Sequence, residues 1–380
     1  MISVAFKMLI GNRAAFIGVV FGIFLAVLLI SQQSGIFLGL LSRSYRIVTN
    51  ISQPNIWVID PATSGEDQIR SMPKNYLEYI KSIPNVEWAV PVNYLVLPLA
   101  TSSGIFKIAE VYGIDDLTKI GAPRILEGQL IDLHRDGAII LDYNSANDLL
   151  AKRQSDGRKV PLKLGDSVEI NGHRAVIVAI GITTPGFFPQ PIVFTLNSQF
   201  NKFSGSNRIG YIAAKTKEKA DVDQVLKRIN SYPKVLGLTR EQLASRMANH
   251  FLKTGILINF GLSVALGLII GFSISGQIFY IMTIHNLNYY ALIKALGGTQ
   301  KTIMLMIITQ GLIVSVIGYI LGIGTTLLWG MAIKNTTLAF EFPWQLLLFT
   351  AVFSLIICLF TVSLSIRKIF KLDPQVLMNV

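Results

Sequence analysis

The residue string that comes nearest to a catalytic motif is the run at 297–302, which reads Gly-Gly-Thr-Gln-Lys-Thr. A phosphate-binding P-loop requires Gly-x-x-x-x-Gly-Lys-Ser/Thr, in which backbone N–H groups surround the phosphates and the lysine reaches the terminal ones. The run lacks that spacing, and it separates two apolar segments instead of following a strand. We therefore expect that this chain does not bind ATP through a P-loop.

Other candidates for catalysis or metal binding are isolated. The sequence holds no Gly-x-Ser-x-Gly elbow and no His-Glu-x-x-His helix. Asp115, Asp116 and Asp142 have the chemistry of metal ligands, but carboxylates at strand ends are more often turn formers or helix caps. The four histidines are scattered, and a single cysteine, Cys358, excludes an intrachain disulfide and a Cys-based metal site. The sequence predicts a non-catalytic protein without a cofactor or metal of its own.

The composition indicates a membrane protein. Of 380 residues, 51% are apolar and only 15% charged, and the mean hydropathy is +0.52. Four runs without a charge are long enough to cross a hydrocarbon core of about 30 Å; they cover 14–41, 255–284, 303–333 and 346–366. The first far exceeds the apolar core of a signal peptide, so we interpret it as a retained span.

Basic residues in the short loops predict the orientation. With four spans both termini share one side, and the opposite short loop, about 334–345, contains only Lys334 as a basic residue. The side of the termini holds Lys7, Arg13, Lys294, Lys301, Arg367, Lys368 and Lys371. We therefore expect cytoplasmic termini, with residues 1–41 as N-terminus and first span, 254–370 as three further spans, and 371–380 as a cytoplasmic tail.

Residues 42–253 differ in composition and predict an extracytoplasmic α+β domain between the first and second spans. Strand-like runs alternate with Gly, Pro, Asn and Asp. Residues 77–86 and 226–235 align without gaps, each as a helix end, a Pro turn and a strand, which favours two strand–helix–strand units packed side by side. A β-rich subdomain of about 110–200 lies between them, and Asn171-Gly172 predicts a hairpin turn within it. The fold class is thus a four-helix membrane protein carrying a large α+β domain.

The spans contain small residues at helical spacing. Three pairs of glycines stand four residues apart, which places both members of a pair on one helix face and permits close helix approach. The pairs are Gly18 and Gly22, Gly267 and Gly271, and Gly318 and Gly322. We expect helix packing at these positions, either within one chain or between two copies.

The segment joining the second and third spans, 285–303, resembles the corresponding loop of MacB/FtsX superfamily ABC transporter permeases. That loop typically reads Arg-Glu-(Ile/Tyr)-(Gly/Ala)-x-(Leu/Ile)-(Arg/Lys)-Ala-(Leu/Ile)-Gly-(Ala/Gly)-(Thr/Ser), and the similarity runs from Tyr290 to Thr299. The run from Arg367 to Leu377 is similar to the family's tail with its Pro-x-x-x-Leu ending. The stretch 22–35 resembles most closely the DevC-like branch, in which the ATPase is a separate polypeptide.

This resemblance implies a mechanism and partners. Two permease copies would pair in the bacterial inner membrane, and a cytoplasmic ATPase that binds ATP and magnesium would dock against the segment 285–303. Nucleotide-driven closure would then move the periplasmic domains, a mechanical task. The DevC-like branch further implies a periplasmic adaptor, an outer-membrane channel and export of a lipid-like or other hydrophobic cargo. The positions expected to couple the ATPase to the permease are Tyr290, Leu292, Lys294, Leu296 and Gly297.

One departure and three alternatives accompany this interpretation. Asn288 and Tyr289 stand where the family usually has an acidic residue often preceded by Arg, so a docking contact through that carboxylate is absent or rebuilt. The segment could instead be an interfacial helix anchored at lipid headgroups. The whole chain could be an FtsX-like signalling subunit that regulates an envelope enzyme without transport, or a lipoprotein-releasing permease. The net charge of +12 forms no dense basic, aromatic-interleaved patch, so we expect no nucleic-acid partner.

Overall fold

A computed structural model describes residues 2–153, 158–186, 188–334 and 336–370 of the chain. These residues form two compact units. The helical unit comprises the residues up to Leu40 and those from Gly255 onward, and the sheet domain comprises Leu41–Thr254. The part of the predicted tail motif from 371 to 377 lies outside the described residues.

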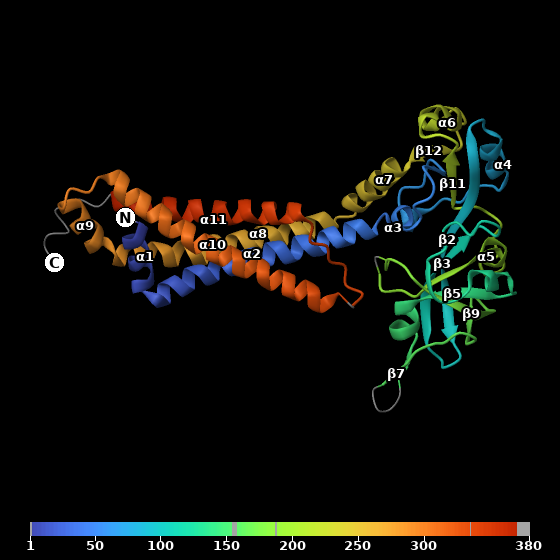
Figure 1. Ribbon diagram of the computed structural model, residues 1–380, viewed down its shortest axis with the longest axis horizontal. Helices are drawn as coiled ribbons and strands as arrows, with labels where there is room; N and C mark the ends of the chain where they lie inside the picture. Colours follow the sequence, from blue (N-terminus) through green and yellow to red (C-terminus); the bar gives the residue numbers. More distant parts are fainter. Residues whose placement is uncertain (1, 154–157, 187, 335, 371–380) are drawn as a thin grey trace. The chain divides into compact units, whose positions relative to one another are not determined.

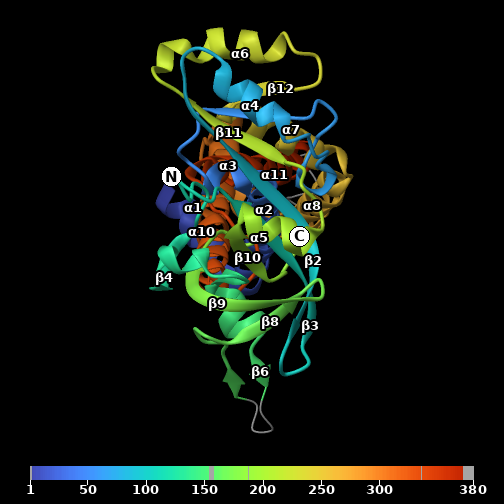
Figure 2. The same cartoon turned by 90° about the vertical axis from the view of Figure 1, so that its right-hand side faces the viewer.

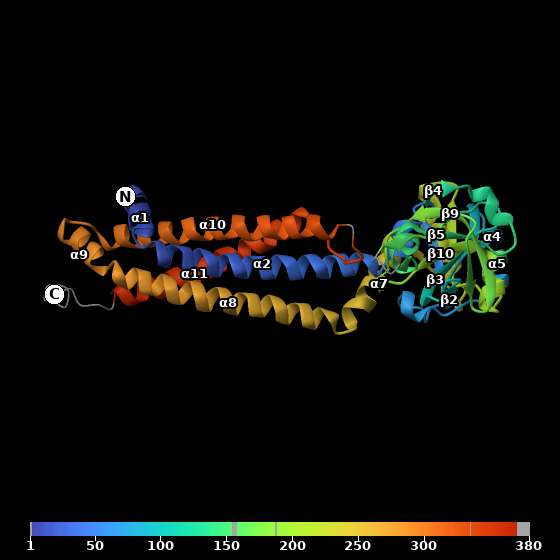
Figure 3. The ribbon, with the colours of Figure 1, turned by 90° about the horizontal axis from the view of Figure 1, so that it is seen from below.

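Six helices build the described part of the helical unit, and Figures 1 and 3 show the four long ones running side by side. Each of the four is long and apolar enough to cross a membrane, which confirms the four predicted spans. The sequence did not predict the short N-terminal helix α1. The helices are α1 (Ile2–Gly11), α2 (Arg13–Arg43), α8 (Ile256–His285), α9 (Leu287–Ala295), α10 (Gln300–Ile333) and α11 (Trp344–Phe370).

Several polar side chains inside the helical unit pair with one another across helices. The hydroxyls of Ser31 and Thr326 lie 2.6 Å apart, and those of Ser315 and Ser354 lie 2.9 Å apart. An unpaired hydroxyl in an apolar interior costs free energy, so these pairs hold the helices in register. Around them the unit has one hydrophobic cluster that draws on every helix of the bundle.

Half of the sheet domain is a pair of strand–helix–strand units. The first is β1 (Ile56–Ile59), α4 (Asn75–Ser82) and β2 (Val86–Thr101), and the second is β11 (Tyr211–Thr216), α6 (Val222–Asn230) and β12 (Leu236–Thr239). Their strands interleave in the order β12-β1-β11-β2, with every neighbouring pair antiparallel. The two segments of similar sequence occupy the same place in the two units, from the helix to the strand that follows.

The other half continues the same sheet from the long strand β2. Figure 2 follows β2 from the half that carries α4 and α6 to the half that carries β8. The sheet order there is β2-β3-β10-β5-β9-β4, and β8 pairs with β2 and β9. These strands are β3 (Phe106–Ile114), β4 (Arg124–Gly128), β5 (Ala138–Asp142), β8 (Ser167–Ile170), β9 (His173–Ile182) and β10 (Ile192–Leu196).

The predicted hairpin is confirmed, because Asn171 and Gly172 join β8 to β9 with φ of 48° and 81°. Positive φ at both central residues is the conformation of a two-residue turn that matches the twist of paired strands. Separate hydrophobic clusters pack on the two faces of this half of the sheet and beneath α4 and α6.

Short elements complete the sheet domain. Two of them, α3 and α7, directly follow and precede long helices in the sequence and pack into one of the hydrophobic clusters. The elements are α3 (Arg46–Asn50), η1 (Glu66–Gln68), η2 (Leu130–His134), η3 (Ser145–Leu149), β6 (Lys152–Arg153), β7 (Lys159–Val160), α5 (Asn197–Ser204), η4 (Lys219–Asp221) and α7 (Arg240–Lys253).

Candidate functional site

The segment between α8 and α10 folds as the short helix α9 between two tight turns. After α9, Gly297 adopts φ +92°, a left-handed conformation that suits glycine because it has no Cβ. The N–H of Gly298 then donates to the Ile293 carbonyl at 2.9 Å, which closes the helix end. The hydroxyl of Thr299 accepts from the N–H of Thr302 at 3.3 Å and caps α10. The local sequence therefore fixes α9 as a separate helix at one end of the bundle.

Much of α9 and the turn after it is exposed and apolar. Leu292 is 59% exposed and Leu296 80% exposed, with the exposed side chain of Lys294 between them. Large apolar side chains on a surface are typical of places that another protein or a lipid covers. Four of the five predicted coupling positions, Leu292, Lys294, Leu296 and Gly297, are thus open to a partner.

Tyr290, the fifth predicted coupling position, is buried at 2% exposure. Its hydroxyl donates to Gln310 Oε1 at 3.0 Å. A side chain enclosed in this way cannot touch a docking subunit directly. The coupling role of Tyr290 stays a prediction, and its side chain faces the bundle, where it attaches α9 to α10.

All six glycines of the predicted pairs lie at contacts between helices of one chain. A Cβ built on any of them would come within 2.6 to 3.0 Å of a side-chain atom of a neighbouring helix. Gly18 and Gly22 face α8, whereas the pairs on α8 and α10 face α2. Helix α2 therefore packs closely on both α8 and α10, at distances that small residues permit.

The aspartates considered as metal ligands accept hydrogen bonds within the protein, and Asp116 Oδ1 accepts from the N–H of Ser198, 82 residues away. Asp115 Oδ2 accepts from the N–H groups of Leu117 and Thr118, and Asp142 Oδ2 from those of Asn144 and Ser145. These are the bonds of turns and helix caps. Among the described residues no group of three or more His, Cys, Asp and Glu side chains could hold a metal ion.

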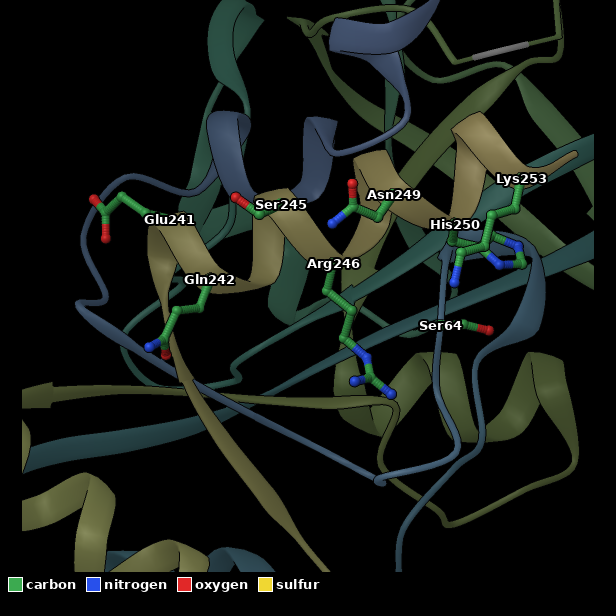
Figure 4. A pocket seen from close by; sticks show the side chains of 8 residues that line it. All are labelled: Ser64, Glu241, Gln242, Ser245, Arg246, Asn249, His250 and Lys253. Atoms are coloured by element: carbon green, nitrogen blue, oxygen red, sulfur yellow. The ribbon is translucent and has the colours of Figure 1, made fainter. Parts of the chain in front are cut away.

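A groove of about 620 Å³, to which polar residues contribute the lining, lies along α7 in the sheet domain. Figure 4 shows His250, Lys253 and Ser64 near one end of it. His250 Nε2 lies 3.1 Å from a carboxylate oxygen of Asp67, and Arg246 donates to the carbonyls of Pro61 and Thr63. These contacts attach α7 to η1 and to the loop before it. The lining residues are Ser64, Glu241, Gln242, Ser245, Arg246, Asn249, His250 and Lys253.

A buried ionic cluster in the sheet domain was not predicted from the sequence. Arg46, which is 1% exposed, lies between two carboxylates and over the ring of Tyr112. Its Nε donates to Glu66 at 3.1 Å and its Nη2 to Glu110. The N–H of Ile47 also donates to Glu66, at 3.2 Å. Burial raises the pKa of both carboxyls, and the neighbouring guanidinium offsets part of that rise.

This cluster joins parts that are distant in the sequence. Arg46 begins α3, just after the end of α2, while Glu66 begins η1 and Glu110 stands on β3. An arginine shortly after an apolar span is typical of an ordinary surface residue, and no local sequence pattern indicates the partners of Arg46. The cluster attaches the start of α3, the helix that follows α2 in the sequence, to both halves of the sheet domain.

The described residues form a bundle of apolar helices that is interrupted in the sequence by a large sheet domain. Two family models match the chain: the MacB-like periplasmic core domain at residues 14–232 and the FtsX-like permease C-terminal domain at 256–374. The chain belongs to the MacB/FtsX family of ABC transporter permeases.

A curated relative and several solved structures are similar to parts of the chain. The relative is a permease protein of Staphylococcus haemolyticus (strain JCSC1435) named for a hemin transport system, HrtB; it is 25% identical over 215 residues, 56% of this chain. The match spans 58% of that relative's own length.

Two of the solved structures are a periplasmic region and an extracellular domain of other proteins. The periplasmic region of MacB from Actinobacillus actinomycetemcomitans is 13% identical, with a TM-score of 0.39, over 53% of this chain and 96% of that one. The extracellular domain of the ABC-type transporter YknZ from Gram-positive bacteria is 11% identical, with a TM-score of 0.35, over 48% and 99%.

Proposed function

We propose that this chain is the non-catalytic membrane subunit of an ATP-driven complex and that it converts ATP hydrolysis by a separate ATPase subunit into motion of the sheet domain. One observation carries the proposal. The segment that resembles the family's ATPase-docking loop forms the short helix α9 and a turn, and it exposes Leu292 on the helix and Leu296 in the turn, with Lys294 between them in the sequence. Membership of an ABC permease family supports an ATPase partner for that surface.

The work in this proposal is mechanical, and cargo does not pass between the helices. The four long helices contain no Asp, Glu or Lys between their end turns, and groups of that kind are expected along a path for charged or coupled solutes. The sheet domain is more than two hundred residues long, which is more than a connector needs. Its motion is therefore the output that we assign to the complex.

We further propose the arrangement and cargo class of the complex. Two copies pair in the bacterial inner membrane, with the termini in the cytoplasm and the sheet domain in the periplasm. The sheet domain engages a periplasmic adaptor that leads to an outer-membrane channel, as in the DevC-like branch. A hydrophobic or lipid-like cargo suits this arrangement, and the name of the relative, which refers to a hemin transport system, fits a hydrophobic cargo.

Co-purification tests the ATPase partner. The tagged chain is solubilised from its native membrane, and bound proteins are identified by mass spectrometry. We expect an ABC ATPase subunit among them, whereas the purified chain alone should hydrolyse no ATP. Clear turnover by the lone chain would refute the separate-ATPase proposal.

Two other functions occur with this fold, and the genes beside the permease gene distinguish them. An FtsX-like signalling subunit would act on an envelope enzyme without transport, and a lipoprotein-releasing permease would act on lipidated proteins. An adaptor gene and an ATPase gene beside this one favour export, whereas an ATPase gene beside a cell-wall hydrolase or its regulator favours signalling.

A further inference from the structure

Gln310 is a polar side chain enclosed in the third long helix. It is 0% exposed and stands three turns into α10, among buried apolar residues such as Ile307 and Val314. A carboxamide in such surroundings costs free energy unless its acceptor and donor both find partners. The position of this group therefore depends on the bonds that it makes.

Gln310 bridges two short helices that lie far apart in the sequence. Its Oε1 accepts from the hydroxyl of Tyr290 on α9 at 3.0 Å, and its Nε2 donates to the carbonyl of Ala5 on α1 at 3.1 Å. The partners stand 20 and 305 residues away from it. Because both hydrogen bonds involve one carboxamide, a shift of either helix strains the bond to the other.

The attachment of α9 depends on this chain of bonds. Of the nine residues in α9, Tyr290 alone is buried. Helix α1, at the other end of the chain of bonds, is separated from α2 only by Asn12, whose Oδ1 accepts from the N–H of Ala15 and caps α2. Helix α2 in turn leads along the sequence to α3 and the sheet domain.

We propose that Gln310 is a positioning residue that ties α9 to α1 and α10, so that the three helices move as one body. A carboxamide is needed because it accepts from a hydroxyl and donates to a carbonyl at the same time. The functional consequence rests on the proposed function: a displacement of α9 by the ATPase passes through Gln310 to α1, and from α1 to α2. Without the carboxamide, α9 moves independently and the displacement is lost.

Hydrogen exchange of the full chain in lipid nanodiscs tests the tie without reference to any ATPase. Gln310→Met keeps an unbranched side chain of similar size, and Tyr290→Phe removes only the hydroxyl. Each variant should speed exchange of the α9 amides about 3- to 20-fold, which corresponds to the free energies measured for hydrogen bonds between membrane helices. The amides of α11 should exchange as before.

A neighbouring residue provides the matched control. The hydroxyl of Thr309 donates to the carbonyl of Leu305 in its own helix, so Thr309→Val should leave α9 unchanged. The double variant Tyr290→Phe with Gln310→Met removes both partners and leaves no orphaned group between them. If the double variant speeds exchange of the α9 amides no more than either single variant does, the two single substitutions act through one hydrogen bond. If the α9 amides of Gln310→Met and of Tyr290→Phe exchange like those of Thr309→Val, the proposal is overturned.

A second readout separates positioning from folding. In a complex with the co-purified ATPase, Gln310→Met should retain the bound ATPase. The change in α1 amide exchange that nucleotide causes should be at least about tenfold smaller than in the wild-type complex. Loss of ATPase binding together with faster exchange in α11 would instead indicate a general packing role and overturn the assignment. If the wild-type chain binds no ATPase at all, the proposed function fails, and the nanodisc experiment still decides the tie.

Discussion

Replacing Arg46 with methionine should destabilise the sheet domain, and the loss should be largest at neutral pH. Methionine keeps most of the side-chain volume but leaves Glu66 and Glu110 buried without their cation; their side chains are 13% and 5% exposed. Removing one partner of a buried ion pair costs about 3–5 kcal/mol. The folded domain limits this cost by binding protons at the two carboxyls.

The pH dependence follows from proton linkage. Burial already raises the pKa of Glu66 and Glu110 in the native domain, so proton binding favours the folded state. The stability contributed by these groups is fully present below the ordinary carboxyl pKa and is lost as the pH rises through the raised, folded-state pKa. Holding a proton on a carboxyl with an ordinary pKa of about 4.3 costs roughly 4 kcal/mol at pH 7 but about 1 kcal/mol at pH 5. The loss caused by Arg46→Met should therefore shrink to about 1–2 kcal/mol at pH 5.

Urea denaturation of residues 41–254, which contain their own sheet and hydrophobic clusters, measures both losses. Lys215→Met is the matched control, because Lys215 pairs with Glu87 at 3.0 Å and both side chains are 43% exposed. It should cost less than about 1 kcal/mol at either pH. An Arg46→Met loss that is the same at pH 5 and pH 7, or no larger than that of the control, would refute the reasoning.

Two further predictions concern the helical unit. The double variant Leu292→Asp and Leu296→Asp should abolish co-purification of the ATPase while the permease stays folded, because charges replace the exposed apolar contact. The control is Gln300→Asp, at an exposed position at the start of α10, which should retain the ATPase. Gly322→Val should lower the thermal unfolding midpoint of the chain in detergent, since a Cβ there would stand 2.7 Å from Val27 Cγ1 and overpacking costs about 1–3 kcal/mol. Gly324→Val, where a Cβ meets nothing within 4 Å, should leave the midpoint nearly unchanged, and equal shifts for the two valines would contradict the packing at Gly322.

The parts of the fold that the sequence predicted correctly are those with a local physical signal. Charge-free runs identified the four long helices, because a span must exclude charge over its whole length. Asn171-Gly172 identified the β8–β9 hairpin, because both residues tolerate positive φ. The long strand β2 contains Pro91 and Pro98, which normally interrupt strands, so its full extent could not be predicted from the sequence.

The parts of the site that were missed depend on long-range pairing. Ionisable residues are the usual signal of function within a span, whereas Gln310 is neutral, and nothing near it in the sequence indicates Ala5 as a partner. Arg46 meets carboxylates 20 and 64 residues away. Tyr290 matched the family's loop by residue type, but residue type alone does not distinguish a contact from an anchor.

The central claim is that the nucleotide cycle of a separate ATPase subunit moves the sheet domain, and pulsed EPR tests the movement on nucleotide binding. A spin label at Lys234→Cys, an exposed position, in a Cys358→Ser background reports the distance between the sheet domains of two copies in a nanodisc with the ATPase bound. We predict that the distance distribution shifts when a non-hydrolysable ATP analogue replaces the nucleotide-free state. The same distribution in both states, in a complex that hydrolyses ATP, would contradict the account.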